Sequence, residues 1–288
     1  VENITLIGSS NINANGNNSA NIITGNSGNN ILKGFGSSDT IYANDGNDTI
    51  YGGNGNDTIY GGDGNDTLNG NGDIDAMYGG DGNDTYVVNH VNDVVSETSS
   101  SGGTDLINSY VSYTASNYVE NLTLKGTGKI NATGNNLSNT LNGNSKNNII
   151  NGESGGDILY GHNGNDTLNG GVGHDYLYGG NGYDTLDGGN NNDILEGGNH
   201  NDILTGGLGN DQLTGGSGND IFQIVIGTGR DLITDYTSGE DSLRISGSYD
   251  QNDFTFSYAS GHTNIHLGND LLAIVQNSTL TGTDLNII

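Results

Sequence analysis

The feature that most constrains this chain is an aspartate that recurs every nine residues. Residues 161–169 show the unit, with Gly161 at position 1, Gly164 at position 4, Asp166 at position 6 and Leu168 at position 8. Most of the sequence can be written as further copies in the same register. Self-similarity at a short fixed period indicates a repeat architecture, in which each unit buries its apolar side chain against its neighbours.

The aspartates at position 6 form two arrays, and two units with asparagine at position 6 precede each array. The asparagines are Asn21 and Asn30 before the first array and Asn139 and Asn148 before the second. The aspartates are Asp39, Asp48, Asp57, Asp66, Asp75 and Asp84, then Asp157, Asp166, Asp175, Asp184, Asp193, Asp202, Asp211 and Asp220. Residues 119–124 repeat residues 1–6, so the same cassette starts twice.

The periodicity divides the chain into four parts. We predict a first repeat array at residues 1–87, an irregular β linker at 88–133, a second array at 134–223 and a small antiparallel cap at 224–288. Period-two alternation of apolar residues predicts strands in the linker and in the cap, including Leu232-Ile233 and Leu243 to Ile245. The last part is also the candidate secretion-signal region.

A unit of nine residues with one large apolar position can form a short strand and a tight turn. The apolar side chain would point inward, and two units would complete one turn of a flattened coil. Glycines in the turns can adopt left-handed backbone conformations without a Cβ penalty. Stacked at ~4.8 Å, the spacing of neighbouring strands, such turns would bring each aspartate beside the one two units later. The sequence therefore predicts an all-β, parallel β-solenoid with columns of carboxylates.

The charge of the chain calls for a positive group that the sequence does not supply. Thirty-four acidic residues stand against six basic ones, so the formal net charge is −28. This charge disfavours nucleic acid and anionic membranes as partners and opposes compaction. The absence of cysteine excludes a disulfide framework and a thiolate metal site. A hard cation bound by oxygen atoms remains, and calcium suits backbone-rich turns better than magnesium, which demands a stricter geometry.

We therefore interpret the fourteen aspartates as calcium ligands. Pairing each aspartate with the one two units later gives four pairs in the first array and six in the second, hence about ten calcium ions. Such a chain should be loose without metal and should fold on binding it, because its apolar column is thin and its carboxylates repel one another. A merely solvated acidic surface would not need aspartate at a fixed spacing over fourteen units.

The units resemble the nonapeptides of RTX (repeats-in-toxin, hemolysin-type) calcium-binding proteins. Residues 179–187 and 215–223 match the pattern G-G-x-G-x-D-x-U-x, where U is a large apolar residue, at every defined position. Residues 231–243 resemble the segment that follows such arrays, and residues 84–88 and 119–122 resemble the linkers between them. The resemblance implies a right-handed parallel β-roll with calcium in the turns, and export by a type I secretion system to the medium or the cell surface.

Other motifs in the sequence are weaker. Residues 152–156 fit the letters G-x-S-x-G of a hydrolase elbow, but that motif needs a strand-to-helix turn, and Ser154 falls at a turn position of the repeat. The six histidines share no zinc-like spacing. The arrays lack the lysine of phosphate-binding loops. No apolar run is long enough to span a bilayer.

We expect a calcium-binding module without catalytic residues of its own, which folds after export. The chain begins at Val1 without an initiator methionine, so we expect it to be a piece of a larger protein. Two alternatives stay open: an accessory module of a secreted hydrolase or polysaccharide-modifying enzyme, and part of a cell-surface adhesin. The residues that precede this segment in the parent protein would decide between them.

Overall fold

The repeat units form parallel strands that alternate between two sheets. The computed structural model describes residues 2–97, 102–227, 229–245, 248–280 and 284–287. It consists of two compact bodies, an N-terminal body at residues 1–130 and a C-terminal body at residues 131–288. Parts of the predicted first array, linker and cap lie outside the described residues, namely residues 1, 98–101, 228, 246–247, 281–283 and 288.

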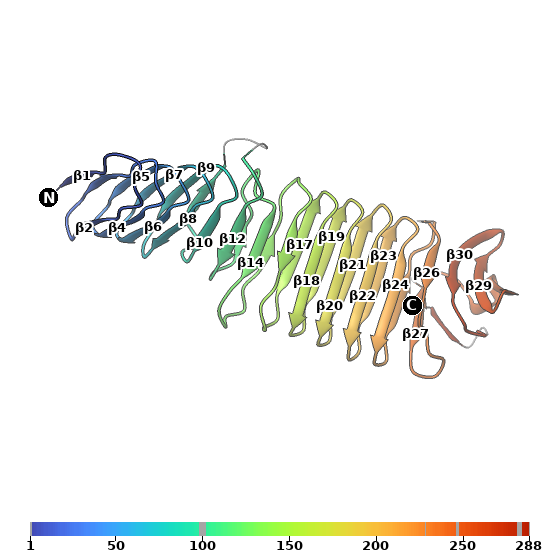
Figure 1. Ribbon diagram of the computed structural model, residues 1–288. Helices are drawn as coiled ribbons and strands as arrows, with labels where there is room; N and C mark the ends of the chain where they lie inside the picture. The colour runs from blue at the N-terminus through green and yellow to red at the C-terminus, as the bar shows by residue number, and fades with distance from the viewer. Residues whose placement is uncertain (1, 98–101, 228, 246–247, 281–283, 288) are drawn as a thin grey trace. The chain divides into compact units, whose positions relative to one another are not determined.

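The N-terminal body is a parallel β-roll (Figure 1). One sheet contains β1 (Asn3–Thr5), β3 (Ile22–Thr24), β5 (Thr40–Asp45), β7 (Thr58–Asp63), β9 (Ala76–Asp81) and β11 (Val94–Ser96). The other contains β2 (Ala14–Asn17), β4 (Ile31–Gly36), β6 (Thr49–Asn54), β8 (Thr67–Asn71), β10 (Thr85–Val88), β12 (Leu106–Ser109) and β14 (Asn121–Leu124). A short strand, β13 (Tyr113–Thr114), precedes β14.

The C-terminal body repeats this arrangement and adds a hairpin. One sheet contains β15 (Ala132–Thr133), β17 (Ile149–Ser154), β19 (Thr167–Val172), β21 (Thr185–Asn190), β23 (Ile203–Leu208), β25 (Ile221–Ile224), β27 (Ser242–Ile245) and β31 (Leu285–Ile287). The other contains β16 (Thr140–Asn142), β18 (Ile158–Asn163), β20 (Tyr176–Asn181), β22 (Ile194–Asn199), β24 (Gln212–Ser217), β26 (Asp231–Ile233), β30 (Asp270–Val275), β29 (His262–Leu267) and β28 (Phe254–Ala259). The helical turn η1 (Gln251–Asp253) leads into β28.

The register of the strands follows the repeat. In the regular units of both arrays, strand residues pair with residues 18 positions later, as Leu168 does with Leu186. The offset is 19 between β1 and β3, and 20 or 21 where β12, β26 and β27 join the roll. Parallel pairing continues beyond the predicted arrays, through β11, β12 and β14 in the N-terminal body and through β26 and β27 in the C-terminal body. Strand β29 pairs antiparallel with both β28 and β30.

The predicted fold class, a parallel β-solenoid with a small antiparallel region near the C-terminus, is confirmed. The extent of the antiparallel region differs, because Leu232-Ile233 and Leu243 to Ile245 lie in β26 and β27, which extend the roll with parallel pairing. Ser154 ends β17, and the next element is the strand β18, so the G-x-S-x-G letters are not at a strand-to-helix turn. Within the described residues, no helix has the length and apolarity that crossing a membrane requires.

Three positions of each unit face the interior of the roll. In the unit that contains β7, Asp57 at position 6 and Ile59 at position 8 are buried, and the buried Gly61 is position 1 of the next unit. The glycines at positions 1 and 2 lie inside the strand, so the turn comprises only positions 4 to 6. Position 9 faces outward, and the rings of Tyr42 and Tyr60 stack there with centroids 4.9 Å apart.

Candidate metal centre

The fourteen aspartates at position 6 point into the roll. Each follows the turn and precedes a strand, as Asp166 does immediately before β19. Their exposed fractions are 2% or less, for Asp39, Asp48, Asp57, Asp66, Asp75, Asp84, Asp157, Asp166, Asp175, Asp184, Asp193, Asp202, Asp211 and Asp220. A carboxylate in this position has lost its water and needs partners inside the protein.

A backbone hydrogen bond joins each aspartate to the one two units later. The N–H of Asp166 donates to Oδ1 of Asp184, and the N–H of Asp184 donates to Oδ1 of Asp202, both at 2.7 Å. Ten such bonds of 2.7–2.9 Å connect the fourteen aspartates, four in the first array and six in the second. The structure therefore brings together the pairs that the nine-residue period predicts, as two columns in each array.

The second carboxylate oxygen, Oδ2, has no hydrogen-bond partner in thirteen of these aspartates. They are Asp39, Asp48, Asp57, Asp66, Asp75, Asp84, Asp157, Asp166, Asp175, Asp184, Asp193, Asp202 and Asp211. A buried charged oxygen without a partner is strongly unfavourable, so such an atom calls for an ion that the protein itself does not supply. One oxygen of each carboxylate is thus held by the backbone, and the other is available to a cation.

Glycine at position 1 leaves the space into which Oδ2 points. A Cβ atom on Gly161 would lie 2.7 Å from Oδ2 of Asp166 and 2.5 Å from the carbonyl oxygen of Gly179. Gly161 does not have a positive φ, so this glycine is required for space and not for backbone freedom. The same pair of oxygen atoms, one carboxylate and one carbonyl, surrounds Gly34, Gly61, Gly152, Gly170, Gly179, Gly188 and Gly197.

Glycines at positions 2 and 4 meet a different requirement. Gly180 and Gly182 have φ angles of 108° and 149°, values that residues with a Cβ rarely adopt. Two of the residues that replace the position-4 glycine, Ser37 and His200, nevertheless have φ angles of 65° and 80°. The turn keeps its left-handed backbone in these units, which depart from the pattern.

The units with asparagine at position 6 satisfy their own polar atoms. Oδ1 of Asn30 accepts from the N–H of Asn26 at 2.9 Å, and Nδ2 of Asn30 donates to the carbonyl oxygen of Ile12 at 2.8 Å and to Oδ1 of Asn26 at 3.0 Å. The N–H of Asn30 then donates to Oδ1 of Asp48 at 2.6 Å, which connects this unit to the column that follows. Because both atoms of the amide have partners, this turn needs no cation.

Four further aspartates extend the columns, and the sequence analysis did not place them there. Asp93, Asp105, Asp231 and Asp241 accept backbone hydrogen bonds at Oδ1 from Asp75, Asp84, Asp211 and Asp220, at 3.1, 2.8, 3.3 and 2.9 Å. Insertions put three of them out of the nine-residue count, although each has a glycine two residues before it and a large apolar residue two residues after it. Asp93 keeps the count, nine residues after Asp84, but lacks the glycines of its unit.

Two of the columns end on carboxylates that are satisfied by the backbone. Oδ2 of Asp93 accepts from the N–H groups of Asn89 and His90 at 3.1 and 3.0 Å. Oδ2 of Asp241 accepts from the N–H of Thr237 at 2.7 Å. These terminal aspartates therefore differ from the thirteen with a free Oδ2.

Burial raises the pKa of the column carboxylates. For Asp166, desolvation is the largest cause, the backbone hydrogen bond from Asn148 opposes it and the carboxylate of Asp184 adds to it, so that the pKa rises to about 7. Desolvation also raises the pKa of Asp57 to about 7 and that of Asp193 to about 8. Without a cation, these carboxylates bind protons near neutral pH.

The residues present fit a calcium ion. Carboxylate and backbone carbonyl oxygens are the ligands that calcium prefers, and it tolerates irregular arrangements of them. The fit rests on two observations: the unpartnered Oδ2 atoms, and the space beside the position-1 glycines, where a carbonyl oxygen also lies in units such as the one at Gly161.

Comparisons with known proteins concern the same repeats. A family model described as the RTX calcium-binding nonapeptide repeat (4 copies) matches residues 15–50, 51–86, 133–168, 152–186, 169–203 and 187–222, which together make up more than half of the chain. No curated protein matches the chain. Among solved structures, the crystal structure of the extracellular lipase LipA from Serratia marcescens matches with 16% identity and a TM-score of 0.23, over 93% of this chain. The chain spans 40% of the length of that lipase.

Proposed function

Because the chain belongs to the family of RTX calcium-binding nonapeptide repeat proteins, we propose that it is the calcium-binding β-roll module of a larger secreted protein and folds as it binds calcium after export. The observation that carries this proposal is the set of thirteen buried Oδ2 atoms without a hydrogen-bond partner. The backbone N–H groups two units earlier hold Oδ1, which orients Oδ2 toward the position-1 glycine. Calcium, when bound, supplies the positive charge that these columns of carboxylates lack.

The proposed number of ions follows the pairs within the columns. Four pairs in the first array and six in the second give about ten calcium ions, enough to offset most of the formal charge of −28. The terminal carboxylates of Asp93 and Asp241 are excluded from this number because backbone N–H groups satisfy them.

Whether the chain folds inside or outside the cell follows from the calcium affinity expected of such modules. Extracellular modules bind calcium with dissociation constants of about 10⁻⁴ to 10⁻³ M, above the free calcium level of a cytosol. The chain would therefore stay unfolded in the cell, where mutual repulsion of its carboxylates opposes compaction, and would fold outside. Type I secretion machinery is the proposed export partner, with the candidate signal in residues 224–288.

We assign no catalytic step to this chain. An enzymatic or adhesive activity would belong to other parts of the parent protein, with the β-roll as accessory module. The amino-acid sequence that precedes this segment in its gene is the observation that distinguishes these two parent types.

Circular dichroism in calcium and in excess chelator tests the proposal. We expect a β-sheet spectrum in millimolar calcium and a spectrum typical of a disordered chain after chelation, with recovery when calcium is added back. An unchanged β-sheet spectrum in chelator at neutral pH would show that the fold does not depend on metal.

The substitution Asp184→Ala tests the pairing within a column. Asp184 lies between Asp166 and Asp202 and is bonded to both, so its loss should weaken two ions and raise the calcium midpoint of folding by about tenfold or more. Asp187→Ala is the matched control, because Asp187 is an exposed aspartate of the same unit. Equal ion number and midpoint for the two variants, measured by titration calorimetry and circular dichroism, would rule out the pairing.

A further inference from the structure

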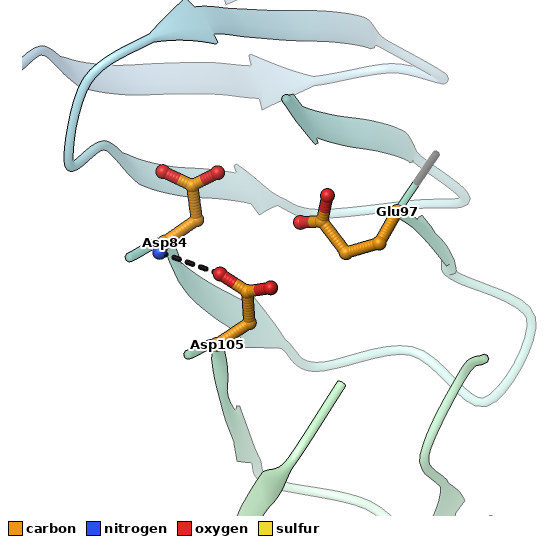
Figure 2. A group of neighbouring side chains, drawn as sticks. All are labelled: Asp84, Glu97 and Asp105. Atoms are coloured by element: carbon orange, nitrogen blue, oxygen red, sulfur yellow. Dashed lines mark hydrogen bonds between the residues drawn. The ribbon is translucent and has the colours of Figure 1, made fainter. Parts of the chain in front are cut away.

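Three buried carboxylates meet near the end of the first array, and two of them, Glu97 and Asp105, lie outside the nonapeptide pattern. Oxygen atoms of Asp84, Glu97 and Asp105 all lie within 4.8 Å of one another, and within the part of the chain that the structure describes this is the one such group of metal-ligating side chains. Their exposed fractions are 1%, 7% and 1%. Figure 2 shows the three carboxylates extending into one region from separate segments, before β10, after β11 and before β12.

Glu97 takes the place that a glycine has elsewhere in the roll. Strand β11 pairs with β9 so that Ser96 lies opposite Tyr78, and Glu97, the next residue, comes opposite Gly79. In the regular unit at Gly61, a Cβ atom would meet the carboxylate of Asp66 and, at 2.6 Å, the carbonyl oxygen of Gly79. Beside Gly79, the side chain of Glu97 therefore supplies an oxygen atom where a regular unit has the carbonyl oxygen of a glycine.

Three different oxygen atoms converge beside Gly79. A Cβ atom there would meet the hydroxyl of Tyr86, Oδ2 of Asp84 and, at 2.5 Å, Oε1 of Glu97. Tyr86 occupies position 8, where the earlier units of the first array have an aliphatic side chain or methionine. The tyrosine at this position places a hydroxyl group in the interior of the roll. Beside the position-1 glycine, a regular site such as that at Gly61 has one carboxylate oxygen and one carbonyl oxygen, whereas the site at Gly79 has oxygen atoms of two carboxylates and a hydroxyl.

The hydrogen bonds of the group leave Oδ2 of Asp84 without a partner. The N–H of Asp84 donates to Oδ1 of Asp105 at 2.8 Å, the dashed line in Figure 2. Glu97 accepts from the hydroxyl of Tyr86 and from the N–H of Gly80. Oδ2 of Asp84 is buried, has no hydrogen-bond partner and lies in the space beside Gly79 with Oε1 of Glu97.

We propose that Asp84, Glu97 and Asp105, with the hydroxyl of Tyr86, bind one further divalent cation at the end of the first array. A formal charge of about −3 in a buried group needs a counter-charge, and oxygen-only donors select a hard cation. The choice of calcium among hard cations rests on the proposed function, whereas Glu97 and Asp105, two of the three carboxylates, come from outside the nonapeptide pattern. The site would connect the regular columns to β11 and β12, which the repeat does not encode.

Native mass spectrometry of the calcium-loaded full chain tests the site by counting ions. Glu97→Gln keeps the size of the side chain and removes one charged ligand, so this variant should retain one calcium fewer than the unaltered protein. Glu196→Gln is the matched control, because it makes the same change at an exposed side chain of the second array, and it should retain the full number. An equal ion number in a folded Glu97→Gln variant would overturn the proposal and would favour a protonated Glu97.

Anomalous diffraction from calcium in crystals of the unaltered protein gives a result that does not depend on the folding of a variant. We expect a peak among the carboxylates of Asp84, Glu97 and Asp105. Peaks in the regular columns without one here would overturn this inference and leave the proposed function intact. If the folded protein showed no calcium peak at any position, the proposed function itself would fail.

Discussion

At position 6, one atom decides whether a turn needs a cation. Asparagine places an amide nitrogen in the interior, and Nδ2 of Asn30 donates to the carbonyl oxygen of Ile12 at 2.8 Å. Aspartate has a second oxygen in place of the amide nitrogen, and Oδ2 of Asp48, the next aspartate in the same column, has no partner. The two residues have nearly the same shape, but Oδ1 of Asn30 accepts from the N–H of Asn26 in its own unit, whereas Oδ1 of Asp48 accepts from the N–H of Asn30, two units earlier. The unit is therefore complete without metal in one case and incomplete in the other.

The substitution Asn30→Asp tests this difference. It removes the two hydrogen bonds that Nδ2 of Asn30 donates to Ile12 and Asn26 and places a charge beside these two acceptor oxygen atoms. The free energy of unfolding in calcium should therefore fall by about 1–3 kcal/mol. Thermal unfolding followed by circular dichroism would measure the change. Asn219→Asp, the same exchange at an exposed side chain, should leave the stability nearly unaltered, and an equal loss in both variants would contradict the argument.

At the scale of the strand, the inner face consists of aspartate, a large apolar residue and glycine in succession. Leu168 is fully buried between Asp166 and the narrow space beside Gly170. This composition explains why so little apolar surface suffices for a roll of this length: the strand stacks through its backbone, and much of its interior is reserved for oxygen atoms. The stacked rings of Tyr42, Tyr60 and Tyr78 add contacts on the outer face.

The substitution Gly161→Ala tests whether position 1 must be empty. Its backbone does not have a positive φ, so alanine is allowed conformationally, but the added Cβ would crowd Oδ2 of Asp166 and the carbonyl oxygen of Gly179. We expect a loss of about 1–3 kcal/mol of stability in calcium and a higher calcium midpoint. Gly72→Ala is the control, because there the nearest atom to a Cβ would be 3.6 Å away and φ is not positive. Chemical denaturation of both variants would decide, and equal tolerance would exclude a steric role for Gly161.

The columns of aspartates could be predicted from the sequence because these residues recur at a fixed interval of nine residues. A period of nine with two units per turn predicts the neighbours of Asp166 without any knowledge of packing, and the structure places Asp184 there. The role of Gly161 could not be predicted in this way, because a glycine needed for space looks the same in a sequence as one needed for φ. Asp105 was missed because an insertion hides its register, which only the pairing of β12 with β10 shows. Glu97 keeps the register, 18 residues after Gly79, but was missed because its part of the chain lacks the glycines of the repeat.

At the scale of the whole molecule, the many buried carboxylates make the metal-free fold depend on pH. Desolvation raises the pKa from 3.8 to about 7 for Asp66 and Asp202 and to about 8 for Asp193. A group whose pKa is raised in the folded state binds its proton more tightly there than in the unfolded chain. Its stabilising contribution is therefore complete below the unfolded pKa and is lost as the pH rises through the folded value.

We expect the metal-free chain to gain β-sheet structure as the pH falls from about 8 to about 5. The calcium midpoint should rise over the same range, because protons and calcium compete for the same oxygen atoms. Circular dichroism in chelator at several pH values, with calcium titrations in parallel, measures both effects. A metal-free spectrum that is independent of pH between these values would contradict the assignment of the column carboxylates as the titrating groups.

Strand residues of the regular units pair with residues 18 positions later, so each strand lies in the same sheet as the strand two units away. Removal of two whole units, for example residues 170–187, would leave every later strand of the C-terminal body in its present sheet. Removal of one unit, residues 170–178, would move each of them to the opposite sheet, and the hairpin of β28 and β29 would attach to the other face. Length in this architecture can therefore change freely only in even steps, because an odd step exchanges the two faces for everything that follows.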